Sequence, residues 1–290
     1  MTNNIYRRSR HATNFGENMN LFLDEKEHVI STQTFINAMR PYVQQGDTVS
    51  VEMDIMVFGK LYDSTIPKKD FLDGIFSIFS ALVGPSGHIV LPSFSYSWGM
   101  DKKEKIFDIQ NTPGKVGTFP EFFRKNINCS RTLDPMFSFL ICGQRSEELA
   151  SINKSSFGKG SVYEKMLNEN AKLISFGLKQ YDPTFVHYVE QYFDENMQKI
   201  DYRYLKKFEG TIIDKGVNYQ SEHYSFMRYP GSEWFFSEKK LVQDLKKTDR
   251  LVSLKIGNAS VDISSCADVF EAGINGMKSD MHYFVEKREK

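Results

Sequence analysis

The stretch FDIQNTPGKVGTFPEFFRKNINCSRTLDPMFSFLICG, residues 107–143, decides the fold that we expect for this chain. Pro120 and Glu121 begin a predicted helix, because a first helical turn tolerates proline and its positive dipole end favours a carboxylate. A polar run follows and stops at Pro135. Residues 136–141 are apolar and short enough for a buried strand, which Gly143 ends. A helix and a buried strand are therefore joined by a charged loop, the kind of place where a scaffold displays functional groups.

The region before this stretch predicts a parallel unit of strand, helix and strand. Residues 48–53 and 88–92 have the pattern of strands, and residues 68–82 have the apolar spacing of an amphipathic helix. Such a succession is typical of parallel βαβ units. Ligands of parallel sheets bind at the carboxyl ends of the strands, here residues 53–59 and 92–96. We expect an α/β fold in which helices sandwich a central mixed sheet.

The remaining chain extends this architecture. Residues 199–235 are rich in tyrosine, lysine and arginine, with a turn at Lys215 and Gly216 between β-like runs, and predict a smaller β-rich segment. Residues 1–30 are polar and predict a poorly ordered arm. Residues 31–290 are then one domain. Further helices are expected at residues 161–167, 184–193, 239–246 and from 266, and further strands at residues 172–177 and 251–256.

Composition excludes some classes of function. The 37 Lys and Arg residues balance 37 Asp and Glu residues, which argues against a general nucleic-acid binder. Three cysteines, Cys129, Cys142 and Cys266, have no paired spacing, so we expect no disulfide framework and a reducing, cytoplasmic location. No apolar run predicts a signal peptide or a membrane span, and no spacing predicts a metal site or a phosphate-binding glycine loop.

One ordered set of motif residues is more specific than any of these features. Its members are Thr112, Pro113, Gly117, Pro120, Glu121, Arg124, Arg131, Thr132, Leu133, Asp134, Pro135, Ser138, Phe157, Gly158, Ser161, Thr184, His187 and Glu190. In this order and spacing they resemble the aminoglycoside 3-N-acetyltransferase family, over roughly residues 35 to 275. The family pattern Arg-Ser-x-His-Pro carries the general-base histidine. The chain has Asp134 at that position.

The resemblance implies a CoA-dependent N-acyltransferase that moves an acetyl or another short acyl group to a primary amine on a sugar. Acetyl-CoA or another acyl-CoA is the expected cosubstrate, without a metal or a covalent acyl-enzyme. The residues expected on the acyl-CoA side are Met53, Asp54, Ile55, Gly59, Pro92, Ser93, Arg131 and Ser138. Among these, Arg131 has the planar fork of donors that holds a phosphate or carboxylate, but it is also a candidate for an ordinary solvated loop residue.

His187 and Glu190 are the candidate base and its partner. They lie three positions apart in a predicted helix and therefore share a face, and a histidine beside a carboxylate is the usual pair for general-base catalysis. Without the resemblance, a surface pair is the better interpretation. Asp134 is the third candidate catalytic residue, either polarising His187 or accepting a proton itself. Alternatively, Asp134 is an ordinary turn residue before Pro135.

The acceptor site is expected beside residues 199–235, with Tyr96, Glu121, Tyr202 and Arg203 as candidate binding residues. That segment is balanced in charge, whereas a pocket for a polycationic aminoglycoside should be acidic. We therefore predict an amino sugar on an anionic carrier, such as a nucleotide-linked sugar used for surface polysaccharide. The alternatives are an aminoglycoside 3-N-acetyltransferase that confers resistance, and a non-catalytic CoA-binding relative. The oligomeric state, including a homodimer, stays open.

Overall fold

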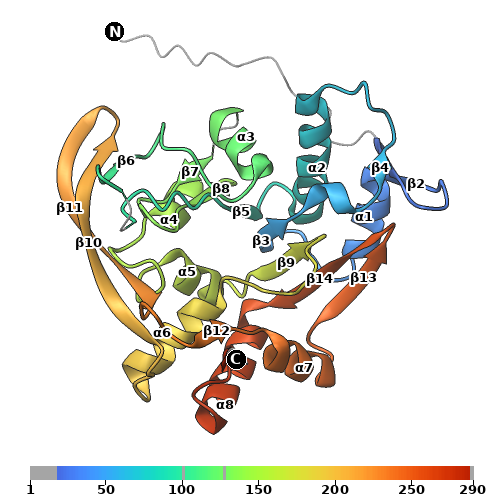
Figure 1. Cartoon of the computed structure of the whole chain (residues 1–290). Helices are drawn as coiled ribbons and strands as arrows, with labels where there is room; N and C mark the ends of the chain where they lie inside the picture. Colours follow the sequence, from blue (N-terminus) through green and yellow to red (C-terminus); the bar gives the residue numbers. More distant parts are fainter. Residues whose placement is uncertain (1–17, 100–101, 127–128, 288–290) are drawn as a thin grey trace.

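A mixed sheet between two layers of helices forms the centre of the protein (Figure 1). The structure is a computed structural model, and it describes residues 18–99, 102–126 and 129–287. In spatial order the sheet consists of β13 (Val252–Ile256), β14 (Ala259–Ser265), β9 (Lys172–Phe176), β3 (Thr48–Met53), β5 (His88–Pro92), β8 (Phe139–Cys142) and β7 (Ser130–Arg131). The predicted α/β class with a central mixed sheet is confirmed.

The three middle strands are parallel. β3 pairs in parallel with β5 on one side and with β9 on the other, and the remaining pairs of this sheet are antiparallel. The carboxyl ends of β9, β3 and β5 therefore meet at one edge of the sheet. The predicted strand–helix–strand unit is confirmed, since α2 (Lys68–Val83) connects β3 to β5.

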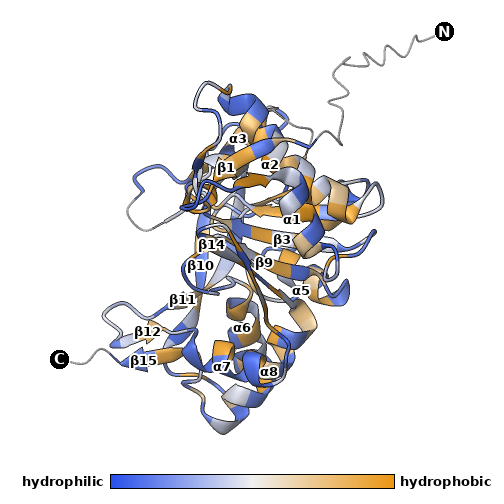
Figure 2. Ribbon diagram, turned by 90° about the vertical axis from the view of Figure 1, so that its right-hand side faces the viewer, coloured by the Kyte–Doolittle hydropathy of each residue, from blue (hydrophilic) through white to orange (hydrophobic). Residues whose placement is uncertain are grey.

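Alternation along the strands of the central sheet places its apolar side chains in two clusters, one on each face. In β5, Ile89 and Leu91 belong to the cluster beneath α1 (Thr32–Met39), α2 and α3 (Thr118–Asn126), whereas Val90 belongs to the other cluster. The second cluster joins the sheet to α4 (Ser146–Ala150), α5 (Val162–Asn168), α6 (Val186–Asn196), α7 (Lys239–Lys247) and α8 (Cys266–Ser279). Figure 2 shows β3 and β9 between α1–α3 above and α5–α8 below.

The predicted β-rich segment is a long hairpin along one side of the molecule (Figure 1). β10 (Arg203–Asp214) and β11 (Val217–Arg228) pair in register along their whole length, and β6 (Ile106–Asp108) adds to β10 in parallel. The expected turn falls at Lys215 and Gly216, which both have positive φ, the backbone that two-residue hairpin turns favour. A pair of short strands follows near the C-terminus, β12 (Trp234–Phe236) with β15 (Val285–Lys287).

Part of the predicted N-terminal arm is folded. Residues 1–17 lie outside the described residues, but β1 (Asn20–Leu23) pairs with β2 (Val29–Ser31) and with β4 (Lys60–Leu61). Leu21 and Phe22 are buried in the core, which is why this segment is held against the sheet. The prediction followed the polar composition and overlooked this short apolar pattern.

The prediction that the cysteines form no disulfide is wrong for two of the three residues. Cys129 and Cys142 form a disulfide, and Cys266 is free and buried. β7 and β8 run antiparallel with Ser130 opposite Ile141, so their pairing brings the two cysteines together. The two cysteines are 13 residues apart in sequence, and this spacing alone does not predict a disulfide. They meet because the loop between them turns the chain back on itself. None of the described helices is long and apolar enough to span a membrane.

The packing of the apolar core can be tested at Phe176, at the end of β9. Its ring is fully buried and lies 4.6–5.4 Å from the ring centroids of Phe35, Phe58 and Phe79. We expect Phe176→Ala to lower the free energy of unfolding by about 3–5 kcal/mol, because it removes buried apolar surface and leaves a cavity. Denaturant unfolding measures the change. Tyr42→Ala, at an exposed aromatic residue, is the control, and equal effects of the two variants would contradict the assigned core.

Candidate active site

His187 and Glu190 form a hydrogen-bonded pair in the first turns of α6. His187 Nδ1 lies 2.7 Å from Glu190 Oε2, as their spacing of three residues on one helix face predicts. The Glu190 side chain is completely buried, and that of His187 is 20% exposed. The edges of Phe157 and Phe236 flank the imidazole ring. A half-buried imidazole is therefore held in place by a buried carboxylate.

Arg203, the first residue of β10, completes this cluster. Its Nε lies 2.9 Å from Glu190 Oε2, its Nη1 donates to the carbonyl of Phe226, and its Nη2 lies 3.4 Å from His187 Nε2. Residue 203 was expected to bind the acceptor directly, and the structure places its guanidinium against the candidate base. The cluster ties the hairpin to α6.

The charges of this cluster determine its protonation. Burial would raise the pKa of Glu190, but Arg203 and His187 outweigh burial and lower the pKa below its usual value. Burial lowers the pKa of His187, and Arg203 lowers it further against the opposing effect of Glu190. Glu190 is therefore ionised and His187 is neutral at neutral pH.

Asp134 belongs to a second buried pair. Its Oδ1 accepts the amides of Met136 and Phe137, each at 2.8 Å, and its Oδ2 lies 3.2 Å from His223 Nε2 on β11. His223 Nε2 also lies 3.2 Å from Ser156 Oγ. Burial acts to raise the pKa of Asp134, but His223 and the two amides bring it below its usual value. The structure thus brings Asp134 together with His223, a residue to which the sequence analysis assigned no role.

Arg131 is committed to backbone carbonyls. Its guanidinium donates to the carbonyls of Ile109, Thr112 and Ser93, and its Nε donates to Ser138 Oγ. Ser138 Oγ in turn donates to the carbonyl of Ser93. Arg131, Ser93 and Ser138 are all buried. In this arrangement Arg131 fixes the loops after β5 and before α3, and its fork of donors is already occupied.

The other residues predicted on the acyl-CoA side lie at the carboxyl ends of the parallel strands. Met53 and Pro92 end β3 and β5, and Asp54 caps the short helix η1 (Ile55–Val57) through the amide of Met56. A side chain at Gly59 would collide with the carbonyl of Leu23, so the backbone there packs closely on β1. The two loops are therefore neighbours at one sheet edge, as parallel pairing predicts.

The residues predicted to bind the acceptor have different environments. Tyr96 is 37% exposed, packs against the rings of Phe94 and Phe137, and has a φ of 50°, a backbone conformation that non-glycine residues rarely adopt. Tyr202 is fully buried and so offers no surface for stacking. Glu121 binds Arg124, which, with the amide of Gly114, lowers the pKa of Glu121 to about 2.

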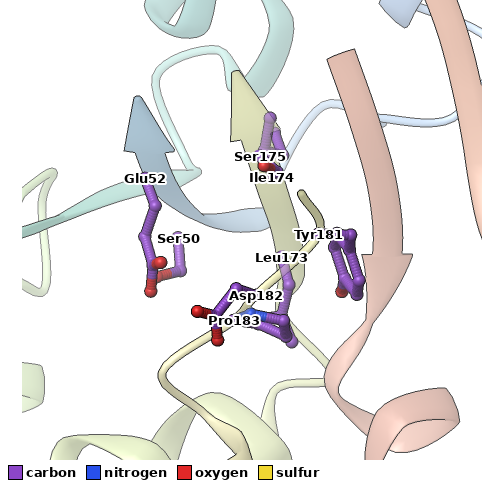
Figure 3. Close-up of a pocket in the computed structure, with 8 residues that line it drawn as sticks. All are labelled: Ser50, Glu52, Leu173, Ile174, Ser175, Tyr181, Asp182 and Pro183. Atoms are coloured by element: carbon purple, nitrogen blue, oxygen red, sulfur yellow. The ribbon is translucent and has the colours of Figure 1, made fainter. Parts of the chain in front are cut away.

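Glu52 and Asp182 are titratable groups near this site that the sequence interpretation missed. Glu52 lies at the carboxyl end of β3, and its Oε1 accepts the amide of Thr184 just before α6. Burial raises the pKa of Glu52 to about 7 and that of Asp182 to about 6. Figure 3 shows both carboxyl groups at one small pocket. The alternating polar residues Ser50 and Glu52 in a buried strand were the available signal. No group of three or more potential metal ligands is found within the described part of the chain.

A family model described as aminoglycoside 3-N-acetyltransferase matches residues 69–278. The chain belongs to this family. It is accordingly a CoA-dependent N-acetyltransferase of the aminoglycoside 3-N-acetyltransferase type. A search of curated proteins found no match.

Several solved structures share the fold. The chain is similar to AAC-IIIb in its binary complex with CoASH, at 18% identity and a TM-score of 0.69, over 86% of this chain and 96% of the other. Sisomicin-bound AAC-VIa gives 18% identity and a TM-score of 0.69, over 86% and 97% of the two chains. The YokD protein from Bacillus subtilis gives 16% identity and a TM-score of 0.68, over 91% and 96%. These similarities confirm the family fold.

Glu52 makes this acetyltransferase sensitive to pH in a defined direction. Because its folded-state pKa of about 7 lies above the ordinary value of 4.5, stability present at low pH is lost as the pH rises through 7. We expect Glu52→Gln to raise the free energy of unfolding at pH 8 by on the order of 1–3 kcal/mol and to change it little at pH 4.5. Denaturant unfolding at the two pH values tests this. Glu147→Gln, at an exposed carboxylate, should be neutral at both, and a pH-independent effect of Glu52→Gln would contradict the assignment.

Proposed function

We propose that this protein transfers the acetyl group of acetyl-CoA to a primary amine of an amino sugar, with His187 as the general base. The single observation that carries the proposal is the hydrogen bond between His187 Nδ1 and the buried Glu190 carboxylate. The amine must lose a proton to become a nucleophile, and a histidine positioned by a carboxylate is suited to accept it.

The contacts of His187 favour one tautomer. An ionised Glu190 can only accept hydrogen bonds, so it holds the imidazole proton on Nδ1. The lone pair is then on Nε2, which faces the donor Nη2 of Arg203. The contact with Arg203 is long, at 3.4 Å, and in the proposed reaction the amine displaces it and passes its proton to Nε2. Arg203 also keeps the ring neutral before the reaction by lowering its pKa.

The reaction needs few groups. The amine nitrogen attacks the thioester carbonyl, the C–S bond breaks, the acetyl group ends on nitrogen, and the proton from the amine passes through His187 toward the departing thiolate. Donors must stabilise the oxyanion that develops on the carbonyl. We assign the acyl-CoA to the adjoining loops at residues 53–59 and 92–93, which lie at the carboxyl ends of parallel strands. A similar fold in complex with CoASH supports this side of the proposal.

Asp134 acts by positioning in this proposal. It is buried against His223 and two backbone amides, so it fixes the loop that leads into β8 and joins that loop to β11. The role of the family's histidine at this position therefore does not pass to Asp134. His187 remains the base.

The identity of the molecule that carries the amine is the least constrained part of the proposal. The nucleotide-linked amino sugar predicted from the sequence rested on basic residues in the hairpin, but Lys207 pairs with Glu209 and Glu222 on the protein itself. The second candidate is an aminoglycoside, as bound in the similar structures of AAC-VIa with sisomicin and of AAC(3)-IVa with apramycin. Both candidates present a primary amine to the same base.

Acetyl transfer can be measured as release of the CoA thiol from acetyl-CoA with a panel of amino sugars, nucleotide-linked amino sugars and aminoglycosides. We expect turnover with at least one class, and we expect His187→Ala to lower kcat by roughly two to four orders of magnitude, the usual contribution of a positioned base. His28→Ala, at an exposed histidine in the turn between β1 and β2, is the control. Binding of acetyl-CoA without turnover of any amine would instead support the non-catalytic alternative.

The pH dependence tests the electrostatic part of the proposal. Because the pKa of His187 is lowered, the acidic limb of kcat/KM should lie below pH 6.5, the ordinary value for histidine. Arg203→Ala removes a cation that lowers this pKa and frees Glu190 to raise it, so the limb should move to higher pH. A full pH–rate profile of both proteins measures the shift. A limb that stays in place would show that His187 is not the titrating base.

A further inference from the structure

His223 is the centre of a cluster of four buried polar side chains that no chemical step of the proposed mechanism uses. The others are Asp134 before β8, Ser156 before α5 and Ser225 on β11, and each of the four is at most 2% exposed. His223 Nε2 lies 3.2 Å from Asp134 Oδ2 and 3.2 Å from Ser156 Oγ. Ser156 Oγ lies 2.6 Å from Ser225 Oγ. One imidazole nitrogen on the hairpin therefore contacts two separate loops.

The hydrogen atoms of this cluster have a defined arrangement. Burial acts to raise the pKa of Asp134, but His223 and two backbone amides bring it below its usual value, so the carboxyl is ionised at neutral pH. An ionised carboxylate only accepts hydrogen bonds, so His223 carries a hydrogen on Nε2 and shares it between Asp134 and Ser156. The Ser156 hydroxyl is not activated as a nucleophile, because the nitrogen that faces it is a donor and not a base.

Two phenylalanine rings connect this cluster to the candidate base. Phe137 donates its amide to Asp134 Oδ1 at 2.8 Å, and Phe157 directly follows Ser156 in the chain. The ring centroids of Phe137 and Phe157 are 4.6 Å apart, and the centroid of Phe157 is 5.4 Å from that of the His187 imidazole. Phe157 is 1% exposed, so its ring keeps water from this side of the imidazole.

The side chains of the cluster join segments that the backbone holds separately. Residues 154–156 are bound to β11 by backbone hydrogen bonds, which they exchange with Tyr224. His223 lies on the same strand and attaches the loop before β8 through its contact with Asp134. The two phenylalanine rings come from these two loops. Their contact with each other therefore depends on the imidazole that joins the loops.

We infer that His223 is a positioning residue for the candidate base His187. Through Asp134 and Ser156 it holds the two phenylalanine rings in place, and the nearer ring orients the imidazole and shields it from water. The inference rests on the proposed function, because that proposal assigns His187 as the base. His223 is buried and acts through these contacts, without touching the substrate.

The protonation of His187 reports on this arrangement. Burial lowers its pKa, Arg203 on β10 lowers it further, and Glu190 on α6 opposes both effects. If loss of His223 loosens the ring of Phe157, water reaches the imidazole, and the pKa of His187 rises toward its ordinary value of 6.5. A change that only lowers the stability of the whole fold leaves the pKa of the folded protein as it was.

The experiment is a pH titration of His187 in the full chain, followed by NMR of the imidazole Cε1–H signal without substrates and assigned with His187→Ala. We expect His223→Leu to raise the midpoint by about 0.5–1 pH unit and Ser156→Ala to raise it by less. His223→Gln keeps an amide donor near the position of Nε2 and should stay close to the wild type. His28→Leu, at an exposed histidine beside Asp24, is the matched control and should change nothing.

Unfolding by denaturant, measured in parallel, separates positioning from stability. Leucine at position 223 leaves the buried carboxylate of Asp134 without its imidazole, which costs stability. Ser156→Ala leaves that pair intact, so it carries the test if His223→Leu does not fold. An unchanged midpoint in folded His223→Leu, or otherwise in Ser156→Ala, overturns the inference even where stability is lost. An equal shift in His223→Gln and His223→Leu also contradicts it, because the donor would then not matter.

Thiol release from acetyl-CoA keeps the two proposals separate. We expect His223→Leu to lower kcat by about 10–100-fold, the effect of a slightly misplaced catalytic group, which is less than the loss expected for His187→Ala. Turnover that depends on His187, together with an unchanged titration in His223→Leu, refutes the inference alone. A shifted titration without turnover of any amine refutes the proposed catalysis alone.

Discussion

Glu190 is a carboxylate with no exposed surface, and the arrangement of the candidate site depends on how its charge is stabilised. Removing a carboxylate from water is costly unless opposite charges and donors replace the solvent. His187 and Arg203 supply these, at 2.7 and 2.9 Å from the same oxygen. Loss of either partner would leave buried charge behind. The three side chains therefore fix one another, and the contact with Glu190 holds the imidazole of the candidate base in one orientation.

This requirement links two distant parts of the chain. His187 and Glu190 come from α6, whereas Arg203 is the first residue of the β10–β11 hairpin and holds the carbonyl of Phe226 on the opposite strand. A second link lies further along β11, where His223 meets Asp134 from the loop before β8. The hairpin is thus joined to α6 through Arg203 and Glu190, and to the loop before β8 through His223 and Asp134. Its position follows from electrostatics as well as from apolar packing.

Sequence patterns predicted the features that depend on neighbours in the chain. The periodicity of α2, the parallel unit that it connects and the contact of His187 with Glu190 all follow from spacing within one element or between adjacent ones. Features that arise from distant pairing were missed, among them the disulfide between Cys129 and Cys142 and the contact of Asp134 with His223. Tyr202 was predicted to bind the acceptor, but its position at the base of the hairpin buries it. In each case the decisive contact is made by a distant segment, and the local sequence pattern does not predict where that segment lies.

The two glutamates near α6 show why residue type alone does not define a role. Burial acts to raise the pKa of both, yet the pKa of Glu190 is lowered and that of Glu52 is raised to about 7. The difference lies in their partners, since Glu190 has a guanidinium and an imidazole, whereas Glu52 has an amide and a second carboxylate nearby. Environments that separate the pKa values of like groups assign them different tasks. Glu190 stays ionised at neutral pH and orients the candidate base. Glu52 changes its charge near neutral pH, so its state depends on the pH of the solution.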